Sequence, residues 1–334
     1  MNDEFKCSAG YFCKGGSLSP NPTTDIQSAD KGAPCSAQKY CPSGTTEELD
    51  CPIGTYNPYT GKGVCFLCPA GKHCPSTGLL NFANCPLGKY CVLATSGQDN
   101  AVDCPAGTYS NKADLRTETE CLSCPPGKYC LGGKDAADGD CDAGFVCPRG
   151  SSTATPNSAT YTFALNTPGI CPQGYMCAAG SKSPTPCPVG SYQDQEQQSD
   201  CKTCPAGKYC DELAIDAAKI LQKNCAAGYV CLKGSQHERP IQLNGDIGGE
   251  LCKLGHYCPV GTADHVPCVA GTYSNREGNP ECQECPAGFY CPTGSETEYQ
   301  PVPCESEKYC PAGSPVGVYC PDGTFNEKTG LESD

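Results

Sequence analysis

Large apolar side chains are rare along this chain, and an aromatic residue recurs directly before a cysteine. The residue before the second cysteine of a Cys-x5-Cys pair is usually tyrosine, as at Tyr40, Tyr90 and Tyr129. A ring in this place can cover a disulfide and the start of the next module, and a binding ladder of rings is the alternative. No apolar pattern of domain length joins these positions, so we expect turns and short two-stranded β-ribbons without a central core.

One segment has the apolar spacing of a helix. In DELAIDAAKILQKN, residues 211–224, the apolar side chains Leu213, Ala217, Ile220 and Leu221 share one helical face, and Asp211 can cap its start. We therefore expect a short helix within 211–224, serving as a spacer inside one repeat unit.

The composition is that of a disulfide scaffold. Of 334 residues, 33 are Cys, 39 Gly and 31 Pro, whereas Trp is absent and Phe occurs eight times. A Cys content of about a tenth is typical of disulfide-stapled modules and excludes the large α/β enzyme folds. Disulfides in this number require an oxidising compartment. The first residues lack the apolar stretch of a signal peptide, so we expect a fragment of a longer secreted chain.

Cysteine spacing divides the chain into repeats. Twelve short pairs have the form Cys-x5-Cys, with CPAGKYC at 204–210 as the typical text, and C-x-x-C steps join wide loops to short pairs. The wide loops run from Cys51 to Cys65, Cys104 to Cys121, Cys187 to Cys201, and Cys268 to Cys282. The predicted units are 1–50 (the C-terminal part of a long unit), 51–103 (short), 104–186 and 187–267 (long), 268–319 (short) and 320–334 (a truncated start). Cys320 would then lack its partner.

The C-P-x-G text favours a tight turn. Pro presets φ for the second place of a turn, and Gly suits the last place, where a side chain would crowd it. Connectivity cannot be deduced from sequence alone. We favour wide loops whose two cysteines bond to each other and short pairs whose two cysteines bond to each other. The alternative joins the first cysteine of two neighbouring short pairs to the third, and the second to the fourth. Each long unit has three short pairs, so this alternative would leave one short pair without a partner pair. Chain entropy assigns about 2.4 kcal/mol to a small ring and about 3 kcal/mol to a wide loop.

These motifs resemble the ephrin-receptor-like cysteine-rich repeat, in which C-P-x-G-T-Y opens a wide loop that closes into C-x-x-C-P-x-G. The text is related in style to the modules of tumour-necrosis-factor and growth-factor receptors, and it extends from Cys7 to Phe325. The resemblance implies an elongated, disulfide-stacked extracellular rod of tandem modules, as in receptor stalks and large surface proteins. The dense short pairs and long inserts depart from the receptor pattern, so no ligand site is carried over.

Charge and candidate chemistry exclude several functions. The net charge of −14 repels nucleic acid and anionic lipid, and no run of about 18 apolar residues could span a membrane. The C-x-x-C steps lack zinc-ribbon spacing, and no catalytic or phosphate-binding motif appears. Metal and catalytic residues are therefore not predicted, although carboxylates at Asp138, Asp140 and Asp142 could chelate calcium. The Ser/Thr/Pro-rich stretch 151–168 permits O-glycans.

Three inserts, 14–34, 148–170 and 232–251, occupy equivalent places after short pairs. Loops of this length are usually functional or disordered. In the second insert Tyr161, Phe163 and Leu165 alternate with smaller residues, which is the period of a half-buried strand. That strand could pack on its own rod or on a neighbouring chain, so these three residues are candidate assembly contacts.

The sequence thus predicts a non-catalytic extracellular or cell-surface structural protein, a rod that assembles with itself or with other extracellular proteins into a coat, appendage or filament. The alternative is a receptor or adhesin stalk that presents a ligand site. A metal-buffering protein is a third hypothesis.

Overall fold

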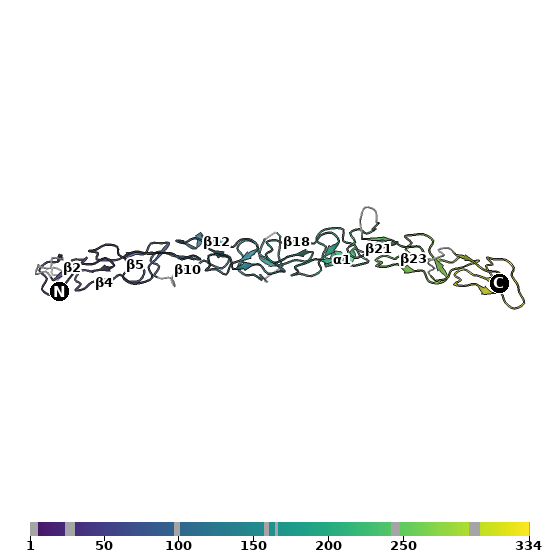
Figure 1. Ribbon diagram of the computed structural model, residues 1–334, viewed down its shortest axis with the longest axis horizontal. Coiled ribbons are helices and arrows are strands. Elements are labelled where there is room, and N and C mark those ends of the chain that lie inside the picture. Colours follow the sequence, from purple (N-terminus) through teal and green to yellow (C-terminus); the bar gives the residue numbers. More distant parts are fainter. Residues whose placement is uncertain are drawn as a thin grey trace. The chain divides into compact units, whose positions relative to one another are not determined.

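The computed structural model describes residues 6–23, 31–96, 101–156, 160–163, 166–241, 248–293 and 301–333. Within these ranges the strands are two or three residues long, and they form two-stranded sheets (Figure 1). The fold therefore consists of tandem small disulfide-rich modules made of turns and short β-ribbons, as predicted. In this part of the chain, no helix has the length and apolar character needed to cross a membrane.

The strands of the N-terminal half follow one another at short intervals. They are β1 (Tyr11–Cys13), β2 (Gly32–Pro34), β3 (Lys39–Tyr40), β4 (Leu49–Asp50), β5 (Thr55–Tyr56), β6 (Phe66–Leu67), β7 (Lys72–His73), β8 (Ala83–Asn84), β9 (Lys89–Tyr90), β10 (Val102–Asp103), β11 (Thr108–Tyr109), β12 (Leu122–Ser123), β13 (Lys128–Tyr129), β14 (Gly139–Asp140) and β15 (Phe145–Val146). A 3₁₀ turn, η3 (Glu118–Glu120), lies in the second wide loop.

The C-terminal half continues the same pattern, with one α-helix among the described residues. Its strands are β16 (Gly169–Ile170), β17 (Tyr175–Met176), β18 (Thr185–Pro186), β19 (Ser191–Tyr192), β20 (Lys202–Thr203), β21 (Tyr229–Cys231), β22 (Gly249–Leu251), β23 (His256–Tyr257), β24 (Val266–Pro267), β25 (Thr272–Tyr273), β26 (Gln283–Glu284), β27 (Phe289–Tyr290), β28 (Val302–Pro303), β29 (Lys308–Tyr309) and β30 (Val318–Tyr319). The helix is α1 (Ala217–Gln222).

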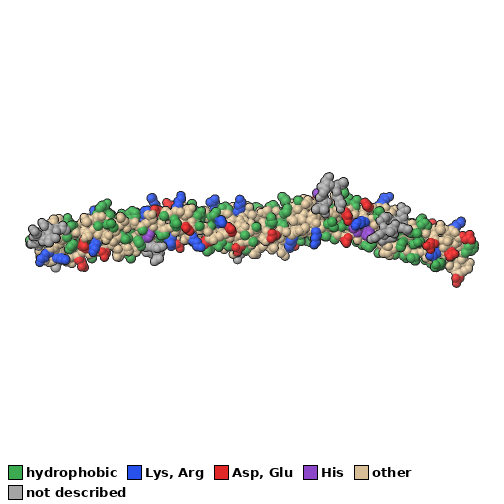
Figure 2. Space-filling view, viewed as in Figure 1, with side chains coloured by type: hydrophobic (Ala, Val, Ile, Leu, Met, Phe, Trp, Pro, Cys, Tyr) green, Lys and Arg blue, Asp and Glu red, His purple; other side chains and the backbone are tan. Residues whose placement is uncertain are grey.

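Each short cysteine pair closes on itself into a ring. The short rings are 7–13, 35–41, 68–74, 85–91, 124–130, 141–147, 171–177, 204–210, 225–231, 252–258, 285–291 and 304–310. The wide loops also close on themselves, through Cys51–Cys65, Cys104–Cys121, Cys187–Cys201 and Cys268–Cys282. Half-cystines make up most of the buried side chains, and apolar groups also reach the surface (Figure 2).

The chain forms two compact units, Met1–Gly169 with Ala179–Ser183, and Ile170–Ala178 with Pro184–Asp334. Inside each unit, backbone hydrogen bonds join consecutive rings. We count the first cysteine of a ring as position 1, so that the glycine of C-P-x-G is position 4 and the second cysteine is position 7. In the first unit the Gly107 amide donates to the Cys130 carbonyl and Gly127 donates to Cys147, both at 2.8 Å. The bond from the Gly150 amide to the Cys124 carbonyl, 2.9 Å, returns in the opposite direction.

The second unit repeats this ladder. The Gly207 amide donates to the Cys231 carbonyl and Gly228 donates to Cys258, both at 2.8 Å, and Gly234 returns a bond to Cys204. Each ring is therefore bonded to the next along its own unit.

The wide loops keep the register of the short rings. Position 7, which holds a cysteine in a short ring, holds a polar residue in the loops that begin at Cys51, Cys104, Cys187, Cys268 and Cys320, namely Asn57, Ser110, Gln193, Ser274 and Asn326. These residues receive the same ladder bond, as from the Gly174 amide to the Gln193 carbonyl at 2.8 Å. The first four side chains are buried, and Asn57 satisfies its own by donating to the Lys39 carbonyl at 2.7 Å. The predicted unit boundaries group these rings and stay a prediction.

The position-4 glycines have two reasons to lack a side chain. Gly107 has φ +86°, and a Cβ there would lie 2.5 Å from the carbonyl oxygen of Gly150. Gln38 and Glu307, which replace glycine at position 4, keep positive φ angles of 74° and 69°. Position 4 therefore keeps a positive φ angle even where it is not glycine. The close approach of a neighbouring carbonyl oxygen, as at Gly107, is an additional constraint on the side chain there.

The helix is shorter than predicted, and Asp216 caps it in place of Asp211. The Asp216 carboxylate accepts the amides of Ala218 and Lys219 at 3.0 and 2.9 Å, whereas Asp211 pairs with Lys223 at 2.7 Å. The ladder explains the late start, because the Ala214 amide and the Ile215 carbonyl bond to neighbouring loops and Ala214 has φ +57°. Leu213 and Leu221, predicted on the packed face, are exposed, and Ile215 is buried with Ile220.

The paired glycines Gly107 and Gly150 provide a test of the close approach. Both have φ near +85°, but a Cβ at Gly150 would meet nothing within 4 Å. Gly150→Ala should lower the free energy of unfolding by about 1 kcal/mol, the cost of left-handed backbone alone. Gly107→Ala should lower the free energy of unfolding by about 3 kcal/mol or more, because the new methyl group must also push away the Gly150 carbonyl. Urea unfolding of the oxidised protein measures both, and equal losses would contradict the close approach.

Candidate functional site

The three inserts dock on their rings in the same way. In each, the carbonyl at position 14 accepts the amide at position 2 of the preceding ring. The bonds are Ser8 to Pro20 at 2.9 Å, Asp142 to Ala154 at 3.0 Å and Ala226 to Glu238 at 3.0 Å. The same carbonyls lie 3.4–3.8 Å from the first sulfur of the ring.

A buried proline follows this contact in every insert. Pro22, Pro156 and Pro240 all stand at position 16. In the first and third inserts the proline ring faces a glycine of the returning strand, Gly32 or Gly249. A proline at position 16 after the first cysteine of the ring is visible in the sequence. It could have indicated that the three inserts are equivalent, but the sequence analysis above did not use it.

The segment with alternating apolar residues in the second insert contains a hydrogen-bonded turn from Thr162 to Asn166. Its described residues 160–163 form no strand of two residues or more, so the predicted extended strand is not found in this part of the segment. The Asn166 amide donates to the Thr162 carbonyl at 3.0 Å, and the Tyr161 hydroxyl donates to the Asn166 side chain at 2.9 Å. The turn places the rings of Tyr161 and Phe163 edge to face, with centroids 5.3 Å apart. Tyr161 is buried, Phe163 is 57% exposed, and Leu165 lies outside the described residues.

The acidic cluster is engaged with lysines. Asp138 accepts hydrogen bonds from the Lys134 ammonium and, at 2.7 Å, from the Leu131 amide, and these bonds hold the pKa of Asp138 below its usual range. Asp140 pairs with Lys128 at 2.6 Å across the β13–β14 hairpin. Calcium binding by Asp138, Asp140 and Asp142 would have to displace both lysines. Cys320 is the one free cysteine of the described residues and is partly exposed.

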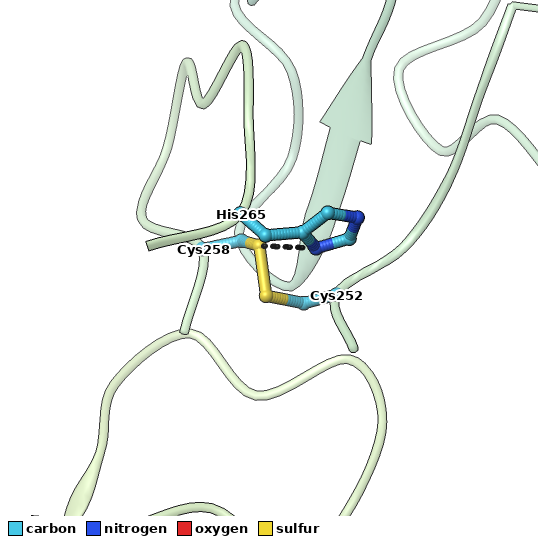
Figure 3. Close-up of side chains that lie close together, drawn as sticks. All are labelled: Cys252, Cys258 and His265. Carbon is cyan, nitrogen blue, oxygen red and sulfur yellow. Dashed lines mark hydrogen bonds between the residues drawn. A yellow bond between two sulfur atoms is a disulfide. The ribbon is translucent and has the colours of Figure 1, made fainter. Parts of the chain in front are cut away.

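A histidine lies against one disulfide of the second unit. The Nδ1 atom of His265 is 3.9 Å from Sγ of Cys258, and ligand atoms of Cys252, Cys258 and His265 lie within 4.8 Å of one another (Figure 3). The two sulfurs are bonded to each other, so neither can act as a thiolate ligand. A disulfide sulfur also carries no hydrogen, and the contact with Nδ1 is therefore one of packing.

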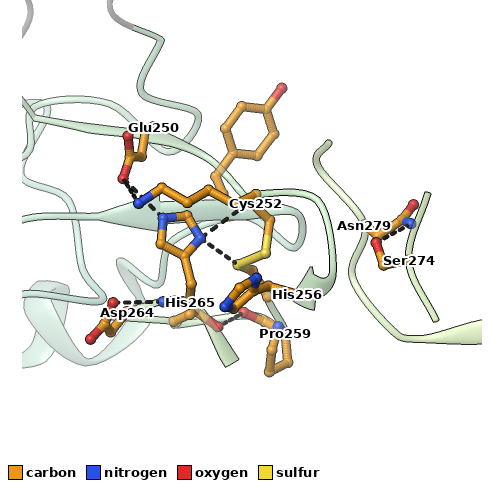
Figure 4. The surroundings of a disulfide bond; sticks show 12 residues. Glu250, Cys252, His256, Pro259, Asp264, His265, Ser274 and Asn279 are labelled. Atoms are coloured by element: carbon orange, nitrogen blue, oxygen red, sulfur yellow. Dashed lines mark hydrogen bonds and ion pairs between the residues drawn. A yellow bond between two sulfur atoms is a disulfide. The ribbon is translucent and has the colours of Figure 1, made fainter. Parts of the chain in front are cut away.

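The hydrogen bonds around His265 assign its tautomer. Nδ1 accepts the Lys253 amide at 3.2 Å, so the proton is on Nε2, which donates to Glu250 at 2.9 Å (Figure 4). His256 donates through Nδ1 to the Leu254 carbonyl and lies 5.8 Å from His265 between ring centroids. The His265 side chain is 9% exposed, and the pair joins β22 to the segment before β24, beside a small apolar cluster of Val230, Cys252 and Cys258. Sequence analysis missed this pair, because His265 and Glu250 are 15 residues apart and no motif joins them.

The His265 bond lowers the pKa of the Glu250 carboxyl, and a weaker effect comes from Lys253 at 3.7 Å. A lowered pKa means that the ionised carboxylate stabilises the fold above its ordinary pKa, and that this contribution is lost as the pH falls through the lowered value. His265→Ala should raise the Glu250 pKa toward about 4.3. Lys253→Ala should raise it less. Carbon-13 NMR titration of the Glu250 carboxyl measures both, and an unchanged midpoint in His265→Ala would contradict the assignment.

Comparison with known proteins places these rings among cysteine-rich repeats. The model of the tyrosine-protein kinase ephrin type A/B receptor-like family matches residues 174–214. Cysteine repeat modular protein A of Toxoplasma gondii is 23% identical over 284 residues, which cover 67% of this chain and 9% of that protein.

Two vertebrate proteins match shorter stretches. Sushi, von Willebrand factor type A, EGF and pentraxin domain-containing protein 1 of Rattus norvegicus is 30% identical over 140 residues, 40% of this chain and 4% of its own length. Signal peptide, CUB and EGF-like domain-containing protein 2 of Mus musculus is 28% identical over 150 residues, 43% of this chain and 12% of its own length. The chain thus spans a small part of each relative. The predicted resemblance is confirmed: the chain is similar to the ephrin-receptor-like repeat over residues 174–214 and to a cysteine repeat modular protein over a longer stretch, and its sixteen disulfides lie in tandem modules.

Proposed function

We propose that this chain is a non-catalytic extracellular structural protein, a segment of a disulfide-stapled rod that assembles into a surface coat, appendage or filament. The observation that carries the proposal is the ladder, in which each ring bonds to the next of its unit through backbone groups. Repetition of such a contact adds length without adding a larger core, as in solenoid proteins. The rod's role is then mechanical.

An extracellular or cell-surface location follows from the chemistry of the rings. Sixteen disulfides hold short loops that bury little besides their own half-cystines. A reducing cytosol would open them, and small modules of this kind depend on such bonds for stability. O-glycans on the Ser/Thr-rich second insert fit the same location.

The inserts are the proposed assembly contacts. Their shared docking holds position 14 of each insert at the equivalent place on its ring, and in the second insert Phe163 presents an exposed aromatic face. The buried Tyr161 ring packs edge to face against Phe163. Within the described residues the assembly contact would therefore be made by Phe163, and Leu165 is the neighbour predicted from the sequence. A receptor or adhesin stalk stays the alternative, and a membrane anchor in the full-length gene would favour it.

Phe163→Asp should abolish assembly in a protein long enough to assemble, because a charge would replace the apolar contact. Tyr161 is left unchanged, since its burial would confuse a folding defect with an assembly defect. Leu213→Asp is the matched control, with a comparably exposed apolar side chain outside any insert. Electron micrographs report assembly and circular dichroism reports folding. Normal filaments in Phe163→Asp would remove this insert as an assembly contact.

A further inference from the structure

A chain of four aromatic rings lies on the first wide loop and the hairpin after it. Tyr59 contacts Phe66, Phe66 contacts Tyr56, and Tyr56 contacts Phe82, with ring centroids 6.0, 5.9 and 5.2 Å apart. Tyr59 is 58% exposed, Phe66 is 40% exposed and Phe82 is 39% exposed. We name these four rings, together with Lys62, the aromatic patch.

The backbone that carries the aromatic patch is bonded to described rings on both sides. Toward the N-terminus, the Lys62 carbonyl accepts the Cys41 amide at 3.0 Å. Toward the C-terminus, the Gly54 amide donates to the Cys74 carbonyl at 3.1 Å. The neighbouring rings of the repeat are therefore in place around this loop, and they leave its aromatic side chains at the surface.

The loop does not need aromatic side chains to keep its backbone conformation. The Tyr59 amide, at position 9, donates to the side chain of Asn57, at position 7, with a distance of 3.1 Å. The same bond recurs in three other wide loops, where position 9 is Lys112, Gln195 and Lys328.

The place of Phe66 is equally variable. Phe66 faces Tyr56 across the hairpin, and the residues that face the equivalent tyrosines are Leu122, Lys202 and Gln283. Cationic, amide and aliphatic side chains thus serve at the places of Tyr59 and Phe66 in the same backbone. The exposed rings are therefore explained by a contact with another molecule and not by the fold.

The charges around the aromatic patch favour an anionic ligand. Residues 51–96 contain three lysines and no Asp or Glu, whereas the whole chain has 37 acidic residues. Two of these lysines pair with Asp114 and Asp103 at 2.7 and 2.6 Å. The third, Lys62, forms no ion pair with the described residues, and its ammonium lies 5.4 Å from the Tyr59 ring centroid and 5.9 Å from that of Phe66. An anionic group bound by Lys62 would stand directly beside the two rings.

Acidic sugars match both properties of the aromatic patch. The C–H groups on one face of a pyranose pack on the electron-rich face of an aromatic ring, and the anionic group at its edge can bond an ammonium. The core of a protein interface, in contrast, contains few lysines. Here a lysine lies over two of the exposed rings, so the arrangement favours a saccharide over the apolar surface of another protein.

We propose that the aromatic patch binds an acidic glycan, a chain of pyranose sugars that carry carboxylate or sulfate groups. Tyr59 and Phe66 would stack on sugar rings, Lys62 would bond one anionic group, and Phe82 would extend the surface. The site would fix the rod to a glycan layer outside the cell. The inference goes beyond the proposed mechanical role, and it requires an extracellular location but no self-assembly.

The test is binding of the oxidised chain to an array of oligosaccharides that carry uronate, sialate, sulfate or no charged group. Acidic glycans should bind, and the uronate, sialate and sulfate arms show which anionic group is preferred. Neutral glycans of the same length should bind about fivefold more weakly or less, because they lack the partner of Lys62. Binding of the acidic glycans should weaken at high salt.

Substitutions assign the binding to the aromatic patch. Tyr59→Gln with Phe66→Gln introduces the residue that other wide loops have at both places, so the fold should persist by circular dichroism, and the dissociation constant should rise about tenfold or more. Lys62→Gln should remove the preference for acidic over neutral glycans. The matched control, Lys112→Gln with Leu122→Gln at the same places of the next wide loop, should leave binding unchanged.

Several outcomes would overturn the inference. They are no binding to any glycan of the array, binding that survives Tyr59→Gln with Phe66→Gln, and an equal loss in the control pair. Equal binding of neutral and acidic glycans would overturn the role of Lys62 and with it the acidic class. The proposed self-assembly is judged separately, because loss of filaments in Phe163→Asp with glycan binding retained leaves this inference intact, and loss of glycan binding with normal filaments leaves the proposed assembly intact.

Discussion

Within each unit, the amide at position 4 of a ring donates to the carbonyl at position 7 of the next ring, and the other local features conform to this bond. It requires a left-handed backbone at position 4, which explains why glycine recurs there and why Gln38 and Glu307 adopt positive φ. It requires no particular side chain at position 7, where a half-cystine and a buried Asn, Ser or Gln are interchangeable. The short rings and the wide loops are for this reason one repeat with two kinds of closure.

This constraint also explains how a chain with few large apolar groups holds a defined structure. Each disulfide limits the unfolded ensemble by about 2–3 kcal/mol in the chain-entropy estimate, and it holds both ends of a ring where the ladder needs them. The backbone groups at the ring edges are then satisfied by the neighbouring ring and not by a sheet of regular length. Exposed lysine pairs such as Lys128–Asp140 add little, because they lie in solvent.

The sequence predicted the repeat, the local ring closure preferred here and the short ribbons, because cysteine spacing and C-P-x-G text are local signals. It failed where the ladder overrides local preference. Asp211 is a sound cap by propensity, yet the bonds at Ala214 and Ile215 delay the helix to Ala217. The alternation at Tyr161 and Phe163 indicated a strand, but the described residues 160–163 form none, and the Thr162 carbonyl accepts the Asn166 amide. The Glu250–His265 pair joins side chains 15 residues apart through the folded repeat, and no spacing rule in one sequence indicates it.

Amide hydrogen exchange of the oxidised protein measures the ladder most directly. If ring-to-ring bonds hold the structure, the amides of Gly107 and Gly127 in the first unit, and of Gly207 and Gly228 in the second, should exchange slowly and lose that protection when the disulfides are reduced. Local ring closure without a ladder would leave these amides open to solvent. Exchange at the rate of an unstructured peptide, with every disulfide intact, would contradict the proposed basis of the fold.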